Sequence, residues 1–191
     1  MKKFKGFLYH ITRYKKLSVG DELDFGNEYN YFAQSIFEKS FEVGEIDINQ
    51  LALTKSFNEF LPEEEKETKN YIYESCLMLR ELILEDVRNK EFKKYPSRLK
   101  CLYCSIDYET AKNWVGAIKR MKPNEPPLQI VKLKVNGRIF QGDGNLMLRN
   151  TYSLNSKIEM AKKYWSGTSN ELPEILFEGK AKVIEIMEEV K

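Results

Sequence analysis

The only histidine of this 191-residue chain, His10, lies in the apolar stretch FLYHIT at residues 7–12. A neutral imidazole can donate one hydrogen bond and accept another. Thr12 places a hydroxyl two residues further on, and alternate residues of a strand share one face. Two hypotheses follow for His10: it contacts a ligand, or it is a structural residue bonded to nearby backbone.

A carboxylate and a guanidinium stand in two later segments. Glu174 opens the apolar segment PEILFEG, and Arg98 lies in YPSRLK. A carboxylate in a water-poor cleft can stabilise a developing positive charge, and a guanidinium can bind phosphate. Glu174 can equally be a solvated residue of an edge strand, and Arg98 a surface residue after a turn.

Cys101 and Cys104 have the C-x-x-C spacing of some metal and redox sites, and Cys76 is the remaining cysteine. The segment LKCLYCS has strand-like composition, however, so the two thiols are expected on opposite faces. No second C-x-x-C pair and no nearby histidine completes a tetrahedral set. We therefore expect no metal site, and an odd cysteine count favours a reducing compartment.

The composition predicts one folded domain over residues 1–191, with 42% hydrophobic and 31% charged residues. The formal charge of +2 is nearly balanced, so no domain-wide footprint for nucleic acid is expected, although a local cluster such as Arg13, Lys15 and Lys16 stays open. No apolar run approaches the roughly 20 residues that span a bilayer. We therefore expect a cytoplasmic protein with no membrane partner.

Strand patterns predict the elements that position these residues. Residues 5–12 form a first strand that carries His10, and LKCLYCS forms a second. LQIVKLKV alternates apolar and polar residues and leads through Asn136–Gly137, a strong hairpin signal, into RIF. PEILFEGKAKVIEIMEEV predicts two short strands around Gly179.

Helical patterns fill the first half of the chain and recur between the later strands. Asn27 is predicted to cap a helix that ends at Gly44, and INQLALTKSF is a weaker candidate. A long helix begins near LPEEEK, and its apolar face is predicted to comprise Ile72, Cys76, Leu79, Ile83 and Val87. Asp107 caps another predicted helix, and Gly167 closes one that starts at Ser156. The result is an α+β domain.

Taken in order, YHIT, LYCSIDYETAKNW, YWSG and PEILFEGKAKVIEI resemble the ADP-ribosyltransferase superfamily, in its H-Y-E-type branch. The YHIT start is similar to nucleic-acid-modifying toxins of that superfamily, and YPSRLKCLYCS resembles an uncharacterised bacterial family. The resemblance covers the first strand and roughly residues 95–187, and it leaves 27–92 as a mostly helical insertion or cap. It implies a split pair of small β-sheets that grip NAD in a cleft.

The resemblance also implies roles for individual residues. His10 holds the ribose of the adenosine half of NAD, and backbone near Thr12 holds the nicotinamide carboxamide. Tyr103 and Ser105 belong to the second motif strand. Glu174 stabilises the oxocarbenium-like ribose that develops when the glycosidic bond of NAD breaks, much as in glycoside hydrolysis.

Three further positions follow from the same resemblance. Arg98 is a candidate for the pyrophosphate, and Tyr103 and Tyr108 both stay open as the aromatic that stacks on nicotinamide. Leu172 occupies the position where arginine-modifying members carry Glu or Gln, so guanidine modification is not expected.

Two functional hypotheses result from the sequence. The first is an ADP-ribosyltransferase that uses NAD as substrate, needs no metal, and modifies a protein or nucleic-acid acceptor. The alternative is a binding or assembly module that has this fold without catalysis.

Overall fold

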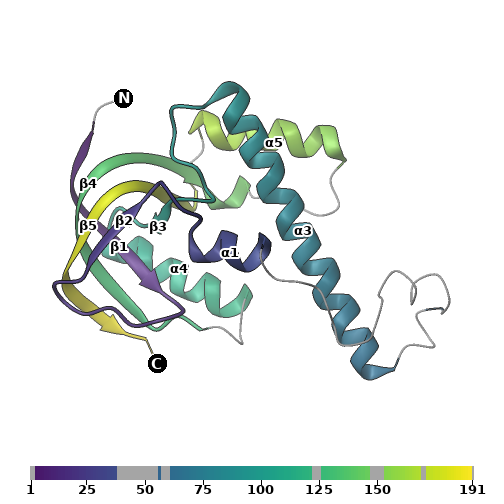
Figure 1. Cartoon of the computed structure of the whole chain (residues 1–191), viewed down its shortest axis with the longest axis horizontal. Helices are drawn as coiled ribbons and strands as arrows, with labels where there is room; N and C mark the ends of the chain where they lie inside the picture. Colours follow the sequence, from purple (N-terminus) through teal and green to yellow (C-terminus); the bar gives the residue numbers. More distant parts are fainter. Residues whose placement is uncertain are drawn as a thin grey trace.

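The computed structural model of the protein describes residues 3–37, 56, 61–121, 126–146, 153–168 and 171–190. Its helices and antiparallel strands belong to the α+β class expected from the sequence (Figure 1). Residues 38–44 of the helix predicted between Asn27 and Gly44, and all of INQLALTKSF except Ser56, lie outside the described residues.

The strands form one five-stranded sheet. They are β1 (Phe4–Thr12), β2 (Glu22–Phe25), β3 (Leu102–Cys104), β4 (Gln129–Asp143) and β5 (Pro173–Glu189). The order is β1-β4-β5-β2, and β3 pairs with the first part of β5. All these pairs are antiparallel.

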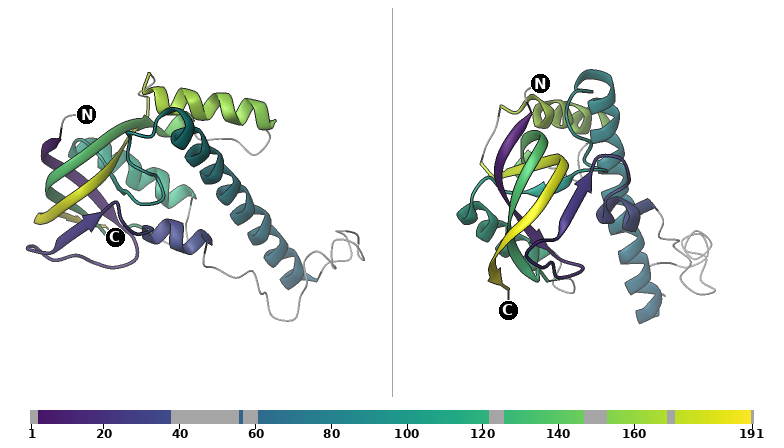
Figure 2. Two further views of the ribbon diagram at one scale, coloured as in Figure 1. Left: turned by 45° about the horizontal axis from the view of Figure 1, so that its top comes forward. Right: turned by 60° about the vertical axis from the view of Figure 1, so that its left-hand side comes forward.

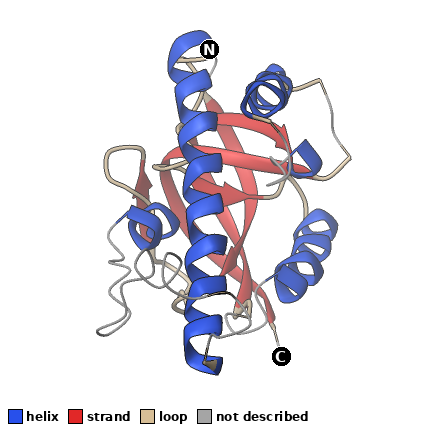
Figure 3. Cartoon of the chain, turned by 90° about the vertical axis from the view of Figure 1, so that its right-hand side faces the viewer, coloured by secondary structure: helices blue, strands red, loops and turns tan. Residues whose placement is uncertain are grey.

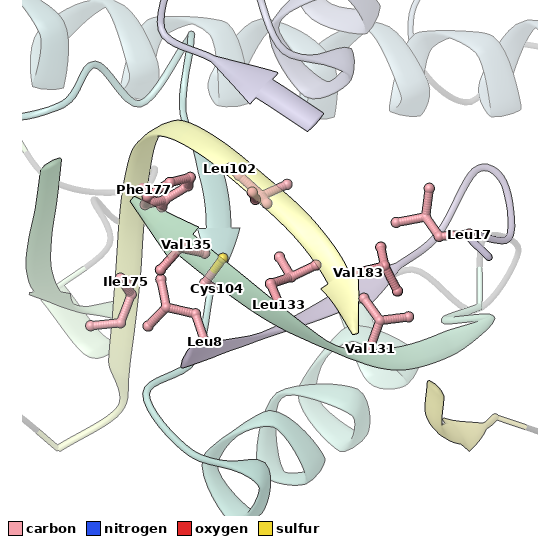
Figure 4. Packing of buried hydrophobic residues seen from close by; sticks show 11 residues of the cluster. Leu8, Leu17, Leu102, Cys104, Val131, Leu133, Val135, Ile175, Phe177 and Val183 are labelled. Carbon is pink, nitrogen blue, oxygen red and sulfur yellow. The ribbon is translucent and has the colours of Figure 1, made fainter. Parts of the chain in front are cut away.

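The sheet curls so far that β3 also meets β1. Tyr9 N–H donates to the Ser105 carbonyl at 2.9 Å, and Ser105 N–H donates to the Tyr9 carbonyl at 2.7 Å. The strands therefore close a circuit, β1-β4-β5-β3-β1, and β4 and β5 bend around its interior (Figures 1 and 4). The resemblance implies a split pair of sheets, whereas the described strands form one curled sheet.

The predicted hairpin at Asn136–Gly137 is wrong, and so is the predicted break at Gly179. β4 and β5 each continue without interruption through these positions, and Gly137 stands directly opposite Gly179. A Cβ on Gly137 would lie 2.0 Å from the Glu178 carbonyl oxygen. The glycines therefore mark a close approach of two strands, which is the other structural meaning of glycine in a strand.

The described helices are α1 (Tyr31–Phe37), α3 (Pro62–Glu91), α4 (Tyr108–Met121) and α5 (Leu154–Ser166), and a 3₁₀ turn follows β4 (Gly144–Leu146). α3 is the longest and extends well past the sheet at its N-terminal end (Figure 2). α3 crosses in front of the strands in Figure 3, and α5 packs against α3. α4 lies against β1.

Helix caps were predicted correctly where the signal is local. Asp107 Oδ1 accepts from Thr110 N–H at 2.7 Å, and Gly167 has the left-handed φ of 67° at the end of α5. The cap of α1 is Asn30 and not Asn27, because the Asn30 side chain accepts from Ala33 N–H at 2.9 Å. Pro62 opens α3, as the prolines of first helical turns do.

The predicted apolar face of α3 is only partly correct. Ile83 and Val87 are buried, but Ile72 is 50% exposed and Leu79 is 45% exposed. The helix instead buries Glu81, which is 0% exposed. A charge at this position interrupts the apolar periodicity, so the pattern in the sequence misplaces the buried face.

Two apolar layers lie on the two faces of the sheet. The inner core fills the circuit of strands and includes Leu8, Leu133 and Phe177 (Figure 4). The outer core joins the sheet to α3 and α5 and includes Trp165. Cys104 belongs to the inner core and Cys101 to the outer core, which confirms that the C-x-x-C thiols lie on opposite faces.

Candidate functional site

Arg98 is the centre of a buried charged cluster that joins three parts of the fold. Its Nε donates to Glu81 of α3 at 2.8 Å, and its Nη1 donates to the Tyr164 hydroxyl of α5 at 2.7 Å. Nη1 also pairs with the Glu174 carboxylate at the start of β5. The backbone N–H of Arg98 donates to Glu85 at 2.9 Å. Arg98 is only 3% exposed, so the cluster lies inside the outer layer.

Glu174, the predicted catalytic carboxylate, is enclosed in this cluster. Its Oε1 accepts from the Tyr164 hydroxyl at 2.6 Å and pairs with Arg98. Glu174 is 7% exposed. Its polar contacts are thus made with protein groups in a layer that is covered by α3 and α5.

The carboxylates of the cluster on α3 also pair with arginines of the same helix. Glu81 also pairs with Arg80 at 2.9 Å, and Glu85 pairs with Arg88 at 3.0 Å. Glu81 and Glu85 therefore each have a guanidinium partner on α3 in addition to the contact with Arg98. Buried charges that are paired in this way are compatible with a stable interior.

These contacts set the ionisation of the cluster. Burial lowers the pKa of Arg98, but the Glu174 and Glu81 carboxylates outweigh burial and hold this pKa well above its usual value. Burial raises the pKa of Glu81, yet Arg98 and Arg80 reverse that effect and the net pKa is lowered. Burial also raises the pKa of the Tyr164 hydroxyl well above its usual value. Tyr164 is therefore a neutral donor at ordinary pH.

His10 makes a structural hydrogen bond. Its Nδ1 lies 2.8 Å from the carbonyl oxygen of Tyr103, and because a carbonyl can only accept, Nδ1 carries the proton. Burial lowers the pKa of His10 and the bond to Tyr103 raises it less, so the ring is neutral at neutral pH. Nε2 is then an acceptor.

His10 and Glu174 belong to opposite faces of the sheet. His10 shares the face of Leu8, and its partner across the strand pair, Val131, also packs in the inner core. Glu174 shares the face of Leu176, which packs in the outer core. The geometry therefore does not bring these two side chains to one cleft.

Tyr103 connects the two faces through its backbone and side chain. Its ring stacks under the Arg98 guanidinium at 5.3 Å, and its hydroxyl donates to the Arg98 carbonyl at 2.9 Å. Its own carbonyl accepts from His10. The segments that carry the resemblance are consequently linked by contacts, although their side chains point to different sides.

The remaining predicted residues lie around the inner face and the β1–β3 bridge. Thr12 is 3% exposed, and its hydroxyl has no hydrogen-bond partner in the described part of the chain. Ser105 is buried and pairs with Tyr9 through backbone. The Tyr108 hydroxyl donates to Glu188 at 2.7 Å, so Tyr108 and Tyr103 lie in different environments.

Neither His10 nor Glu174 lies in the wall of either of two hollows on the described surface. The larger, of about 670 Å³, lies on β1, β4, β5 and β2 and is lined by Lys5, Lys134, Lys180 and Lys182 among others. The smaller, of about 400 Å³, lies along residues 24–31.

Sequence reasoning missed Glu81, Tyr164 and Asn30. The Asn30 amide donates to the carbonyls of Arg98 and Cys101, both at 2.8 Å, and thereby holds the loop before β3 against α1. These partners are far apart in the chain. Glu81 itself was the one signal in the sequence that could have indicated the buried cluster, because it is a carboxylate among apolar residues of the long helix.

Metal and thiol chemistry find no support in the described residues. They contain no cluster of histidine, cysteine and carboxylate side chains that could hold a metal ion. Burial raises the pKa of both the Cys101 and the Cys104 thiols, which keeps them protonated and unreactive. No helix in the described ranges is long and apolar enough to cross a membrane.

A family model described as "Protein of unknown function (DUF2441)" matches residues 8–189 of the chain. No curated protein matches it.

Proposed function

The chain belongs to the DUF2441 family of proteins of unknown function, and from its own residues we propose that it is a binding module whose Arg98 cluster stabilises the fold. The observation that carries this proposal is the enclosure of Glu174. A carboxylate that stabilises a cation on a substrate must face that substrate. Glu174 instead contacts Arg98 and Tyr164 within the outer layer.

The electrostatics of the cluster agree with a structural role. The lowered pKa of Glu81 and the raised pKa of Arg98 hold both groups in one charge state at ordinary pH. A general acid or base works best with a pKa near the operating pH. The cluster thus links α3, α5 and β5, and neither Glu81 nor Arg98 is suited to proton transfer.

The test is incubation of the protein with NAD, with nicotinamide release and the melting temperature as readouts. A binding module of this kind releases no nicotinamide. Release that is lost in Glu174→Gln, measured at a temperature where the variant is folded, would overturn the proposal. Because the variant also loses the Arg98 pair, its folded fraction is determined by far-UV circular dichroism in the same samples.

A second candidate function is NAD-dependent ADP-ribosyl transfer, and one observation favours it. The buried Thr12 hydroxyl has no partner among the described residues, and it shares the inner face of the sheet with the acceptor Nε2 of His10. A buried hydroxyl without a partner costs roughly 1–3 kcal/mol. A bound ligand that donated or accepted a hydrogen bond there would recover this energy.

Thr12→Val separates the two candidates. Without ligand, the variant should be as stable as the parent or up to about 2 kcal/mol more stable, because it removes an unsatisfied polar group of similar shape. If NAD binds at this face, saturation at about 100 times the dissociation constant stabilises the parent by about 2.7 kcal/mol. Thr12→Val should lose about 0.5–1.5 kcal/mol of that gain, because it removes one hydrogen bond to the ligand. Equal melting temperatures with and without NAD in both proteins would eliminate the second candidate.

A further inference from the structure

The outer face of the sheet is divided into a covered half and an open half. Towards the start of β5, Leu176 and Phe140 pack under α3 and α5. Further along the same strands, β4 and β5 bend round the edge of the molecule away from α3 (Figure 1). The outward residues there are polar and exposed.

The open half carries two rows of side chains across four strands. Both rows follow the strand register, so their members stand side by side. The first row is Lys5, Asn136, Lys180 and Asp24, and the second is Phe7, Lys134, Lys182 and Glu22. Neighbours within a row are about 4.8 Å apart and the rows about 6.6 Å apart, which are the ordinary spacings of a sheet.

The positive charge of these rows is incompletely neutralised. Lys182 lies 3.3 Å from Glu22. Over the part of the chain that the structure describes, Lys5, Lys134 and Lys180 are in no ion pair. The two carboxylates, Glu22 and Asp24, both stand on β2 at the edge of the sheet.

An exposed aromatic ring stands among these lysines. Phe7 is 50% exposed in the middle of β1, and Lys132 lies 5.2 Å from the centre of its ring. Together with the lysines it lines the hollow of about 670 Å³ on this face. A shallow basic hollow with an exposed ring has the two components that proteins use on single strands, namely lysines for phosphates and a ring for stacking a base.

We propose that this basic sheet face (Lys5, Phe7, Lys134, Lys180 and Lys182) binds a single-stranded nucleic acid. The carboxylates on β2 repel phosphates, so the strand lies over β1, β4 and β5. The lysines follow the backbone and Phe7 stacks on a base. An acidic polypeptide would engage the lysines but has no systematic use for the ring, which is why a nucleic acid fits better.

This inference rests on the proposed binding function, for which it names the partner. The two can fail separately. Release of nicotinamide from NAD that is lost in Glu174→Gln would end the binding-module proposal and leave the basic sheet face untouched. Failure to bind oligonucleotide would end this inference and leave the role of the Arg98 cluster as it stands.

The experiment is fluorescence anisotropy with a labelled single-stranded oligonucleotide of about 20 nucleotides, at several salt concentrations between 50 and 200 mM. The parent should bind, with an affinity that falls as salt rises. Lys5→Gln/Lys134→Gln/Lys180→Gln should weaken binding at low salt by about tenfold or more and flatten the logarithmic salt dependence by about 0.7 per lost phosphate contact. Phe7→Ala should weaken binding about fivefold or more with the salt dependence unchanged.

The matched control removes the same charge from the helices. Lys69→Gln/Lys90→Gln/Lys163→Gln alters exposed residues of α3 and α5 and should bind like the parent. An equal loss in both triple variants would mean that net charge alone acts, and it would overturn the proposal. So would no binding by the folded parent at 50 mM salt, or poly-glutamate competing as well as the oligonucleotide while Phe7→Ala has no effect. Far-UV circular dichroism confirms that each variant is folded.

Discussion

At the scale of single residues, Arg98 is the group on which most of the buried polar contacts depend. It contacts Glu81, Glu174 and Tyr164 with its side chain and Glu85 with its backbone. A paired buried charge adds little over an apolar alternative, but removing one partner leaves the others unpaired. The cost of substitution is therefore expected to be much larger than for an ordinary surface arginine.

Arg98→Met should lower the free energy of unfolding by about 3–5 kcal/mol, because it leaves the buried Glu174 without its guanidinium partner and removes one of the two guanidinium partners of Glu81. Urea denaturation at neutral pH measures this change. Arg138→Met is the matched control, since Arg138 pairs with Glu178 at a site where the arginine side chain is 43% exposed. That pair should contribute about 0–1 kcal/mol. Equal losses in the two variants would contradict a special role for the cluster.

His10 predicts a dependence of stability on pH. Burial lowers its pKa below the ordinary value of 6.5, so the unfolded state takes up the proton first as pH falls. Stability contributed by the neutral ring is therefore complete above pH 6.5 and decreases below it, by at most about 1.4 kcal/mol per pH unit. Because the chain has a single histidine, His10→Asn should reduce this slope just below pH 6.5. If the unfolding free energy of His10→Asn changed with pH as steeply as that of the parent, the predicted role of His10 would be refuted.

At the scale of elements, the sequence predicted best what is decided locally. The caps at Asp107 and Gly167 depend on groups within a few residues and were predicted correctly. Asn136–Gly137 carries a strong local turn signal, yet the opposite strand at Gly179 decides its structure. Pairing over long distances in the chain has no counterpart in local propensity, so this error has a physical reason.

The dependence on long-range strand pairing also limits what the sequence can predict about the candidate site. Arg98, Tyr103 and Glu174 were predicted as site residues from the segments that carry the resemblance, and in the structure Arg98 contacts both of the others. Which face each side chain occupies depends on the strand register. A shift of one residue moves a side chain to the other face, and the sequence alone does not fix that shift. The separation of His10 from Glu174 could not be predicted for this reason.

The close approach of β4 and β5 gives a prediction for the strands. Gly137→Ala places a Cβ 2.0 Å from the Glu178 carbonyl oxygen, and the strands must separate to accommodate it. We expect a loss of about 1–3 kcal/mol in thermal or urea unfolding. Gly116→Ala is the contrasting variant, because the nearest atom is 3.6 Å away and a helix interior favours alanine. It should be stabilised by about 0.5–1 kcal/mol. Two variants with the same sign of effect would contradict this account.

At the scale of the whole molecule, the two cores share one sheet. Cys104 of β3 lies in the inner core, and Cys101, which directly precedes β3, lies in the outer core. The Trp165 indole N–H donates to the Leu84 carbonyl at 2.8 Å between α5 and α3. A layer that shares its strands with the other cannot unfold while the other stays intact. The fold is therefore expected to lose both layers together.

Unfolding should consequently be a single transition. In Trp114→Phe, the remaining tryptophan fluorescence reports on Trp165 in the outer core, and far-UV circular dichroism reports on all elements. The two urea transitions should coincide in midpoint and slope, as two-state behaviour requires. Midpoints that differ beyond experimental error would show that the outer layer unfolds separately.

The pairing of β1 with β4 has a consequence for how the chain acquires this fold. Phe4 stands opposite Gly137 and Thr12 opposite Gln129, so β1 leaves the ribosome long before β4, the strand with which it pairs along its whole length and which lies more than a hundred residues later. Contacts of such long range form slowly, because a large loop must close before they contribute. During synthesis, the nascent β1 must remain unpaired or be shielded by a chaperone until most of the chain has emerged.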